Sequence, residues 1–226
     1  MPFCISSKAR LTDRDLGRFS GDTLFDRAAR AVCGAGCLPR KELYEAWEMA
    51  RRVRRRFRGG RIVDLAAGHG LLAHLLLLLD DSSPGALLID PSAPPSAARL
   101  HAVLAEAWPR LAERVVFERT SVESVSLDSG DLVVSSHACG ALADAVLDRA
   151  ATARARVAVL PCCHDFEVND PGPLSGWVDR SLAVDVMRAV RLERRGYRVW
   201  THTIPAAITP KNRLLVGEPR LRSAQV

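Results

Sequence analysis

Lysine, aromatic side chains and long apolar runs are all scarce in this chain of 226 residues. Only Lys8, Lys41 and Lys211 are lysines, so arginine carries almost all of the positive charge behind the net charge of +6. Aromatic residues make up 5% of the chain. The core must therefore be built from small and branched aliphatics, which suits a buried parallel sheet covered by helices. The most apolar stretch, 70–79, is shorter than the roughly 20 residues that cross a bilayer, so it indicates a core helix.

The cysteines lack the pattern of a secreted disulfide framework. Six are scattered through a chain that is long enough for one good-sized core, two of them are adjacent, and no signal peptide precedes them. We therefore expect a reducing, cytoplasmic environment and no membrane association.

A helical extension is predicted over residues 1–58. Apolar residues recur at helical spacing after Pro39, and the outer face of that helix is rich in arginine. These arginines are Arg51, Arg52, Arg54, Arg55, Arg56 and Arg58. Two interpretations stay open. The face is either solvated, with cations that suit the helix C-terminus, or a phosphate-facing patch in which Arg51, Arg54 and Arg55 contact the substrate.

Strands and helices alternate over residues 59–218, which form the predicted main domain. Strands are expected at 61–65, 86–89, 115–118, 131–135, 157–160, 198–203 and 213–216, and helices at 69–79, 97–111, 141–151 and 177–194. The alternation predicts a doubly wound, Rossmann-like α/β domain with a mostly parallel, seven-stranded sheet. The connection between the last two strands is too short for a crossover, so one strand near the edge should be antiparallel. Residues 219–226 are predicted to form a loose tail.

An acidic residue and a glycine-rich turn mark the end of the first strand of this domain. Gly68 and Gly70 allow a tight turn and the close approach of a ligand, and the next helix offers unpaired N–H groups. Asp64 lies in an apolar run, where a lone carboxylate needs a partner. Asp90 ends the second strand, where a carboxylate can bind the ribose hydroxyls of an adenosine. The expected cofactor contacts of these two stretches are Asp64, Ala66, Gly68, His69, Gly70 and Asp90.

Two cofactors fit this loop by its spacing. The stretch 68–73 also matches a Gly-x-Gly-x-x-Ala dinucleotide fingerprint, and Asp90 would serve NAD equally well. The negative charge of Asp64 argues against a dinucleotide, because it would repel the pyrophosphate, whereas it would attract an ammonium group. No obvious hydride-transfer constellation is present either.

The loop, Asp90 and the reversed strand together resemble class I S-adenosylmethionine (SAM) methyltransferases. The resemblance implies that Asp64 and the loop hold the methionyl end of SAM. Ser121 and Val122 follow the third strand, where the adenine would lie, and Ser136 follows the fourth strand and completes the expected cofactor set.

Two short motifs, His-x-Cys-Gly at 137–140 and Cys-Cys-His at 162–164, follow the fourth and fifth strands. They are similar to a branch of that family which includes tRNA ribose 2′-O-methyltransferases acting on the acceptor stem. The zinc-finger segments of those enzymes are not visible here, and three lysines do not readily build the lysine-centred tetrad of many ribose methyltransferases. The resemblance therefore implies methyl transfer without fixing tRNA as the substrate.

Both motifs are predicted to face the substrate side of the sheet. His137 or His164 is expected to take a proton from the acceptor as the methyl group transfers. The expected substrate contacts are Cys139, Cys162, Cys163 and Lys211. Structural packing and a metal site are the alternatives for the thiols, but adjacent cysteines rarely bind one ion, and no metal is assigned.

The sequence thus predicts a SAM-dependent methyltransferase whose first candidate substrate is RNA, with tRNA among the candidates, bound through the arginine-rich face. The alternatives are a small-molecule or protein acceptor, an NAD-dependent oxidoreductase, and a SAM-binding protein without catalysis.

Overall fold

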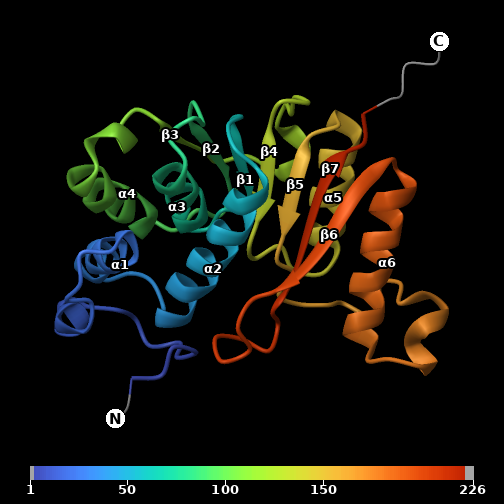
Figure 1. Cartoon of the computed structure of the whole chain (residues 1–226), viewed down its shortest axis with the longest axis horizontal. Helices are drawn as coiled ribbons and strands as arrows, with labels where there is room; N and C mark the ends of the chain where they lie inside the picture. Colours follow the sequence, from blue (N-terminus) through green and yellow to red (C-terminus); the bar gives the residue numbers. More distant parts are fainter. Residues whose placement is uncertain (1–2, 222–226) are drawn as a thin grey trace.

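A computed structural model describes residues 3–221, so residues 222–226 of the predicted tail lie outside the described residues. Its centre is a seven-stranded sheet with the order β3-β2-β1-β4-β5-β7-β6 (Figure 1). The strands are β1 (Ile62–Leu65), β2 (Ala86–Ile89), β3 (Val115–Glu118), β4 (Leu132–Ser135), β5 (Arg156–Val159), β6 (Tyr197–Thr203) and β7 (Arg213–Pro219). The first five are parallel, and β7 runs antiparallel to both β5 and β6. The predicted fold class, including one reversed strand near the edge, is confirmed.

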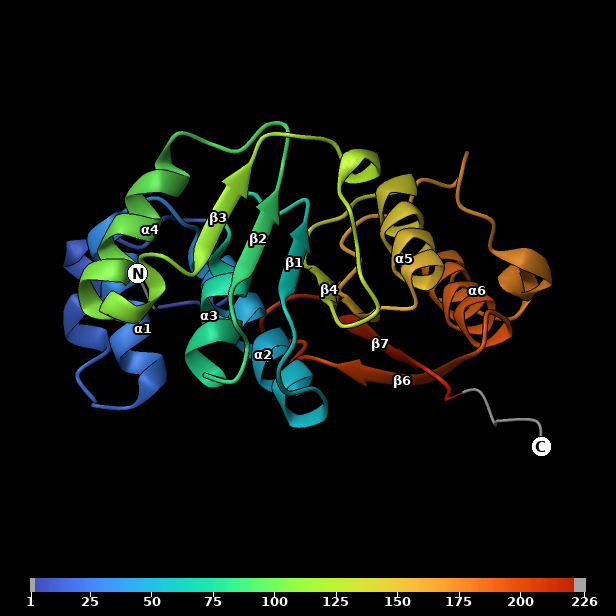
Figure 2. The same ribbon diagram turned by 90° about the horizontal axis from the view of Figure 1, so that it is seen from above.

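Helices cover both faces of the sheet, as Figure 2 shows. One face carries α1 (Leu24–Ala35), α2 (Arg40–Arg56), α3 (Leu71–Leu79) and α4 (Ser96–Ala107), and the other carries α5 (Ala141–Ala153) and α6 (Arg180–Arg194). Alternate residues of each central strand point to opposite faces of the sheet. Ile62 therefore packs against the helices of the α1–α4 face, and Val63 against those of the α5–α6 face. Two aliphatic cores result, one on each face of the sheet.

Capping residues define the ends of the first N-terminal helix, and apolar spacing defines the buried face of the second. Thr23 caps α1 by accepting a hydrogen bond from the Asp26 backbone N–H, and Gly36 ends the helix in the left-handed conformation. In α2, residues such as Leu43, Met49 and Val53 are fully buried. They pack in the same core as α3, and this packing holds the N-terminal end of α2 over the carboxyl ends of the strands.

The structure differs from the predicted boundaries around the last helix. This helix begins at Arg180 rather than near Trp177, because the Asp179 side chain caps it by accepting from the Leu182 N–H. The preceding residues Gly172–Gly176 form a separate 3₁₀ turn. Three further 3₁₀ turns are Asp13–Arg18, Pro109–Leu111 and Val122–Ser124. Within residues 3–221, no helix has both the length and the apolar character that a membrane crossing requires.

Candidate active site

The loop after β1 is shaped by three residues with positive φ. Ala66, Gly68 and Gly70 have φ angles of 60°, 55° and 78°. At Gly70 a Cβ atom would lie 2.0 Å from Leu88 Cδ2, so only glycine fits there. At Gly68 a Cβ atom would meet nothing within 4 Å and would project into open space. The loop therefore offers bare backbone to a ligand at Gly68 and packs tightly on the sheet at Gly70.

Asp64 is buried beneath this loop without a partner. Its exposed fraction is 1%, and neither carboxylate oxygen has a hydrogen bond to any residue within 3–221. Burial raises the pKa of this carboxyl to about 8, the nearby Ala73 backbone N–H opposes the effect, and the negative charge of Asp90 adds to it. A buried acid without a partner is costly, so the site is suited to a positively charged or hydrogen-bond-donating ligand group.

Asp90 connects the end of β2 to the glycine loop. One of its oxygens accepts the Gly68 backbone N–H at 2.8 Å, and the other accepts the Ser92 N–H at 2.8 Å. His69 forms a hydrogen bond to Ser96 Oγ at 3.0 Å, at the start of α4. These contacts hold the loop and the β2 end together, as expected of one nucleoside-binding unit.

A small pocket of about 120 Å³ opens between this loop, the end of β4 and the start of α2. Gly68, Gly70, Ser136 and His137 line it together with Glu42. Glu42 was not assigned to the site from sequence. Burial raises its pKa, and the neighbouring Glu45 adds to the effect. The signal for Glu42 was its place in the first turn of α2, but only the packing of α2 on α3 brings that turn to the site.

The expected adenine contacts lie beyond β3 in the Val122–Ser124 turn. Val122 is buried in the core on the α5 side, so its side chain serves the fold. Ser121 is half-buried, and its hydroxyl interacts with that of Ser124 at 3.1 Å. Of the two, Ser121 is the more accessible to a ligand.

The loops after β4 and β5 bring three thiols together. The sulfurs of Cys139, Cys162 and Cys163 all lie within 4.8 Å of one another, and those of Cys139 and Cys162 are 2.7 Å apart. Lys211 donates to Cys163 Sγ at 3.3 Å, and this hydrogen bond lowers the pKa of the Cys163 thiol. Burial raises the pKa of the Cys162 thiol. Lys211, expected to contact the substrate, is thus bound to the thiol cluster.

The two candidate catalytic histidines have different surroundings. His164 is enclosed, with a side chain that is 6% exposed, an Nε2–Asp185 Oδ1 distance of 2.8 Å and a ring stacked on Phe166. Asp185 also pairs with Arg213 at 2.6 Å and with Arg188 at 3.2 Å. His164 therefore belongs to a buried ionic network. By contrast, His137 is exposed and lines the small pocket beside the glycine loop, so of the two histidines it is the one open to a ligand.

Arg54 does not lie on the predicted phosphate-facing patch. Its side chain is 2% exposed, its Nε donates to the Leu76 carbonyl, and its guanidinium pairs with Asp80 at 3.1 Å. The expectation for Arg54 is wrong because this position of α2 faces α3 and carries the arginine into the interior. Arg51 and Arg55 are exposed, and Arg51 pairs with Glu48 at 3.3 Å.

Comparison with known proteins identifies the class of the chain. Residues 41–169 match a family model described as a methyltransferase domain. This match covers more than half of the chain, so the chain belongs to that family. A search of curated proteins found no match.

Solved structures share the fold. An O-methyltransferase family protein from Burkholderia thailandensis has a TM-score of 0.54 at 19% identity, covering 96% of this chain and 66% of that one. The mitomycin 7-O-methyltransferase MmcR gives 0.52 and 19%, covering 93% and 64%. A proposed RNA methyltransferase from Pyrococcus horikoshii gives 0.50 and 15%, covering 82% and 87%. The chain thus spans about two thirds of the two O-methyltransferases. At these identities the likeness shows the fold alone.

The chain carries a methyltransferase domain, and the site fits SAM as its methyl donor. The partnerless Asp64 suits the ammonium group of the methionyl end, the open space at Gly68 admits a ligand against the backbone, and Asp90 lies where ribose hydroxyls are expected. Family membership favours a methyl donor over NAD as the ligand of this site.

Proposed function

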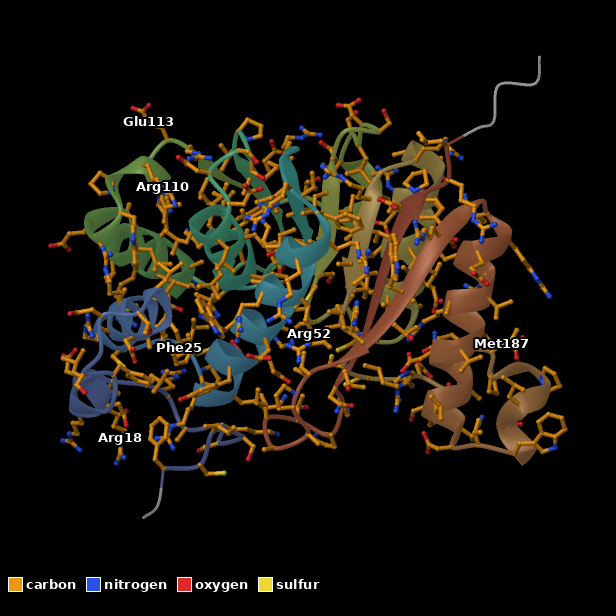
Figure 3. All side chains as sticks on the ribbon, viewed as in Figure 1. Arg18, Phe25, Arg52, Arg110, Glu113 and Met187 are labelled. Atoms are coloured by element: carbon orange, nitrogen blue, oxygen red, sulfur yellow. The ribbon has the colours of Figure 1, made fainter. Side chains whose placement is uncertain are left out.

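We propose that this methyltransferase acts on RNA, with tRNA as the first RNA to test because of the resemblance of its two short motifs. The observation that carries the proposal is a basic strip, defined as Arg51, Arg52, Arg55, Arg56 and Arg198. It lies where the C-terminal part of α2 passes β6, and Arg52 is its member at the carboxyl end of β6. Figure 3 shows Arg52 of α2 beside the end of β6, and its Nε donates to the Thr203 carbonyl at 3.1 Å.

An indole lies at the centre of this strip. The guanidinium of Arg56 is 4.1 Å from the Trp200 ring centroid, and that of Arg198 is 4.9 Å from it. Arg56 and Arg52 add to the effect of burial in lowering the pKa of His202 on the same strand, so the local field is positive. Clustered arginines with an aromatic ring suit the phosphates and bases of a nucleic acid.

The strip leads to the methyl-transfer site through the β6–β7 connection. The Ile204 N–H donates to the Asn212 carbonyl at 2.9 Å, and the adjacent Lys211 reaches the thiol cluster. In Figure 1 this connection is the loop at the lower edge, below the carboxyl ends of β4 and β5. An RNA strand bound along α2 and β6 would therefore be directed toward His137.

His137 is the proposed proton acceptor. SAM, held by Asp64, Gly68 and Asp90, would supply an electrophilic methyl group to the acceptor and leave as S-adenosylhomocysteine. The acceptor hydroxyl loses its proton to His137, which returns it to solvent. The protein otherwise contributes alignment of the two reactants, which is the main requirement of such a displacement.

The test uses SAM labelled with tritium in its methyl group, offered with total RNA, total protein or a metabolite extract. We expect label in the RNA fraction. The double variant Arg55→Gln/Arg198→Gln should weaken RNA binding and reduce the slope of log affinity against log salt by about 1 to 2. The matched variant Arg14→Gln/Arg194→Gln removes two exposed charges elsewhere and should leave both unchanged. Label confined to protein or metabolites, or equal effects of the two variants, would contradict the proposal.

A small-molecule acceptor is the second candidate, because the described residues also enclose an apolar cavity. It has a volume of about 520 Å³ and lies between α6 and the β6–β7 pair, with Pro161, Asp185 and Arg213 among its lining residues. This size is typical of sites for small organic ligands. Label in the metabolite fraction would favour this candidate.

A further inference from the structure

Three thiols from two separate loops converge at the acceptor side of the site. Cys139 follows β4, and Cys162 and Cys163 follow β5, yet all three sulfurs lie within 4.8 Å of one another. Elsewhere in residues 3–221 no second group of three or more His, Cys, Asp or Glu residues brings its ligand atoms this close together. Cys139 is exposed and the other two are half-buried, so the cluster is open to solvent on one side.

The backbone, rather than the thiols, sets this convergence. The Leu160 N–H donates to the Ser135 carbonyl at 2.9 Å, and the Gly140 N–H donates to the Cys163 carbonyl at 3.1 Å. Gly140 has a φ of 56°, which a side chain would strain. The Gly140 carbonyl in turn accepts from the buried Arg188 at 3.0 Å. The two loops are therefore fixed to each other and to α6, and the cluster is preorganised.

We propose that Cys139, Cys162 and Cys163 form a zinc site with three protein ligands and an open fourth position. Thiolates are preferred zinc ligands, with bonds of about 2.3 Å, so tetrahedral coordination places the sulfurs about 3.8 Å apart. All three sulfurs already lie within 4.8 Å of one another, and zinc binding requires the Cys139 and Cys162 sulfurs, now 2.7 Å apart, to separate by about 1.1 Å. Because the backbone ties above place both members of the adjacent pair near Cys139, the usual objection to neighbouring cysteines does not apply here.

The charge of the zinc complex and the number of protein ligands are both consistent with this site. Zinc binding displaces a proton from each of the three thiols to solvent, and the resulting complex carries one net negative charge. The ammonium group of Lys211, 3.3 Å from Cys163 Sγ, offsets that charge. With three protein ligands, the fourth position is left for water or for an acceptor atom, as in catalytic rather than structural zinc sites. This inference does not depend on whether the acceptor is RNA.

The first measurement is the zinc content of the full chain, purified under reducing conditions and passed through a metal-buffered column. We expect about one zinc ion per chain, and a thiolate-to-metal charge-transfer band when cobalt replaces zinc. Cys139→Ser, Cys162→Ser and Cys163→Ser should each lose the ion and the band. Cys4→Ser, which removes an exposed thiol outside the cluster, should keep both.

Two results would overturn the proposal. One is wild-type protein without zinc and without a cobalt band while SAM still binds, which would show a folded chain with no metal site. The other is a Cys139–Cys162 disulfide in the reduced preparation, detected by mass spectrometry as the loss of two hydrogens. Circular dichroism of each serine variant separates loss of the ion from loss of the fold.

Discussion

The two halves of the active site are built in different ways. On the cofactor side, after β1 and β2, the site consists of bare backbone and two carboxylates, Asp64 and Asp90, and its shape depends on φ angles. On the acceptor side, after β4 and β5, it consists of side-chain clusters: three thiols on loops tied by backbone hydrogen bonds, and His164 in a buried ionic network around Asp185. The shape of the first half therefore depends on backbone conformation, and the chemistry of the second half depends on which side chains the loops bring together.

The largest effect should come from the acceptor half. His137→Gln removes the proposed proton acceptor and should lower kcat by about 10²- to 10⁴-fold, the usual contribution of general base catalysis. Because the cofactor half is untouched, calorimetry should give an unchanged SAM affinity. A variant with full activity would remove His137 from the mechanism.

His164→Gln serves as the comparison for that variant. It breaks the 2.8 Å contact with Asp185, so we expect it to lower the free energy of unfolding in a urea titration. A loss of activity without a loss of stability would instead make His164 the acting base.

The next largest effect should separate two glycines of the cofactor half. Gly70→Ala places a Cβ 2.0 Å from Leu88 and adds a left-handed strain, so we expect a loss of about 2 to 5 kcal/mol of stability. Gly68→Ala adds the strain alone, about 1 to 2 kcal/mol, but its methyl group enters the pocket and should weaken SAM binding. Urea unfolding and calorimetry measure the two quantities. Equal stability losses would contradict this distinction.

Asp64→Asn should weaken SAM binding by about 10- to 100-fold at pH 8, because it removes a charged hydrogen-bonding partner. In the wild type, SAM affinity should rise with pH up to about 8, since only the ionised carboxylate forms the ion pair and binding releases its proton. Calorimetry in buffers of different ionisation enthalpy detects that proton.

The same residue has the opposite effect on stability. Its folded pKa of about 8 lies above the usual value near 3.9, so the folded state binds its proton more tightly than the unfolded state. The stability that this proton contributes is fully present below about pH 3.9 and is lost as pH rises toward 8. Cofactor-free Asp64→Asn should therefore be more stable than the wild type at pH 8. If the difference in free energy of unfolding between wild type and Asp64→Asn did not change with pH, the burial of an unpaired acid would be contradicted.

The smallest effect concerns Ala66, a residue with a side chain at a φ of 60°. Ala66→Gly should relieve the left-handed strain and so raise the free energy of unfolding by about 1 kcal/mol. The greater freedom of glycine in the unfolded chain offsets part of this gain. Thermal unfolding measures it. A marked loss of stability would show that the Ala66 methyl group packs usefully.

The sequence predicted the fold well because its signals are local. Each signal spans only a few residues: the Asp64–Gly70 turn, the alternating strands and the short final connection. The structure confirms the element that each of them predicted. Arg54 was misplaced because one helical face holds both solvent-facing and α3-facing arginines, and sequence spacing alone does not separate them. Glu42 and the Asp185 network were missed because they depend on long-range packing.

The division of the site into two halves is tested most directly by a structure of the chain with S-adenosylhomocysteine. We expect the amino group of this product near the buried Asp64, the ribose hydroxyls at Asp90, and the sulfur directed toward His137. A cofactor bound elsewhere, for example in the apolar cavity between α6 and β6, would contradict the account.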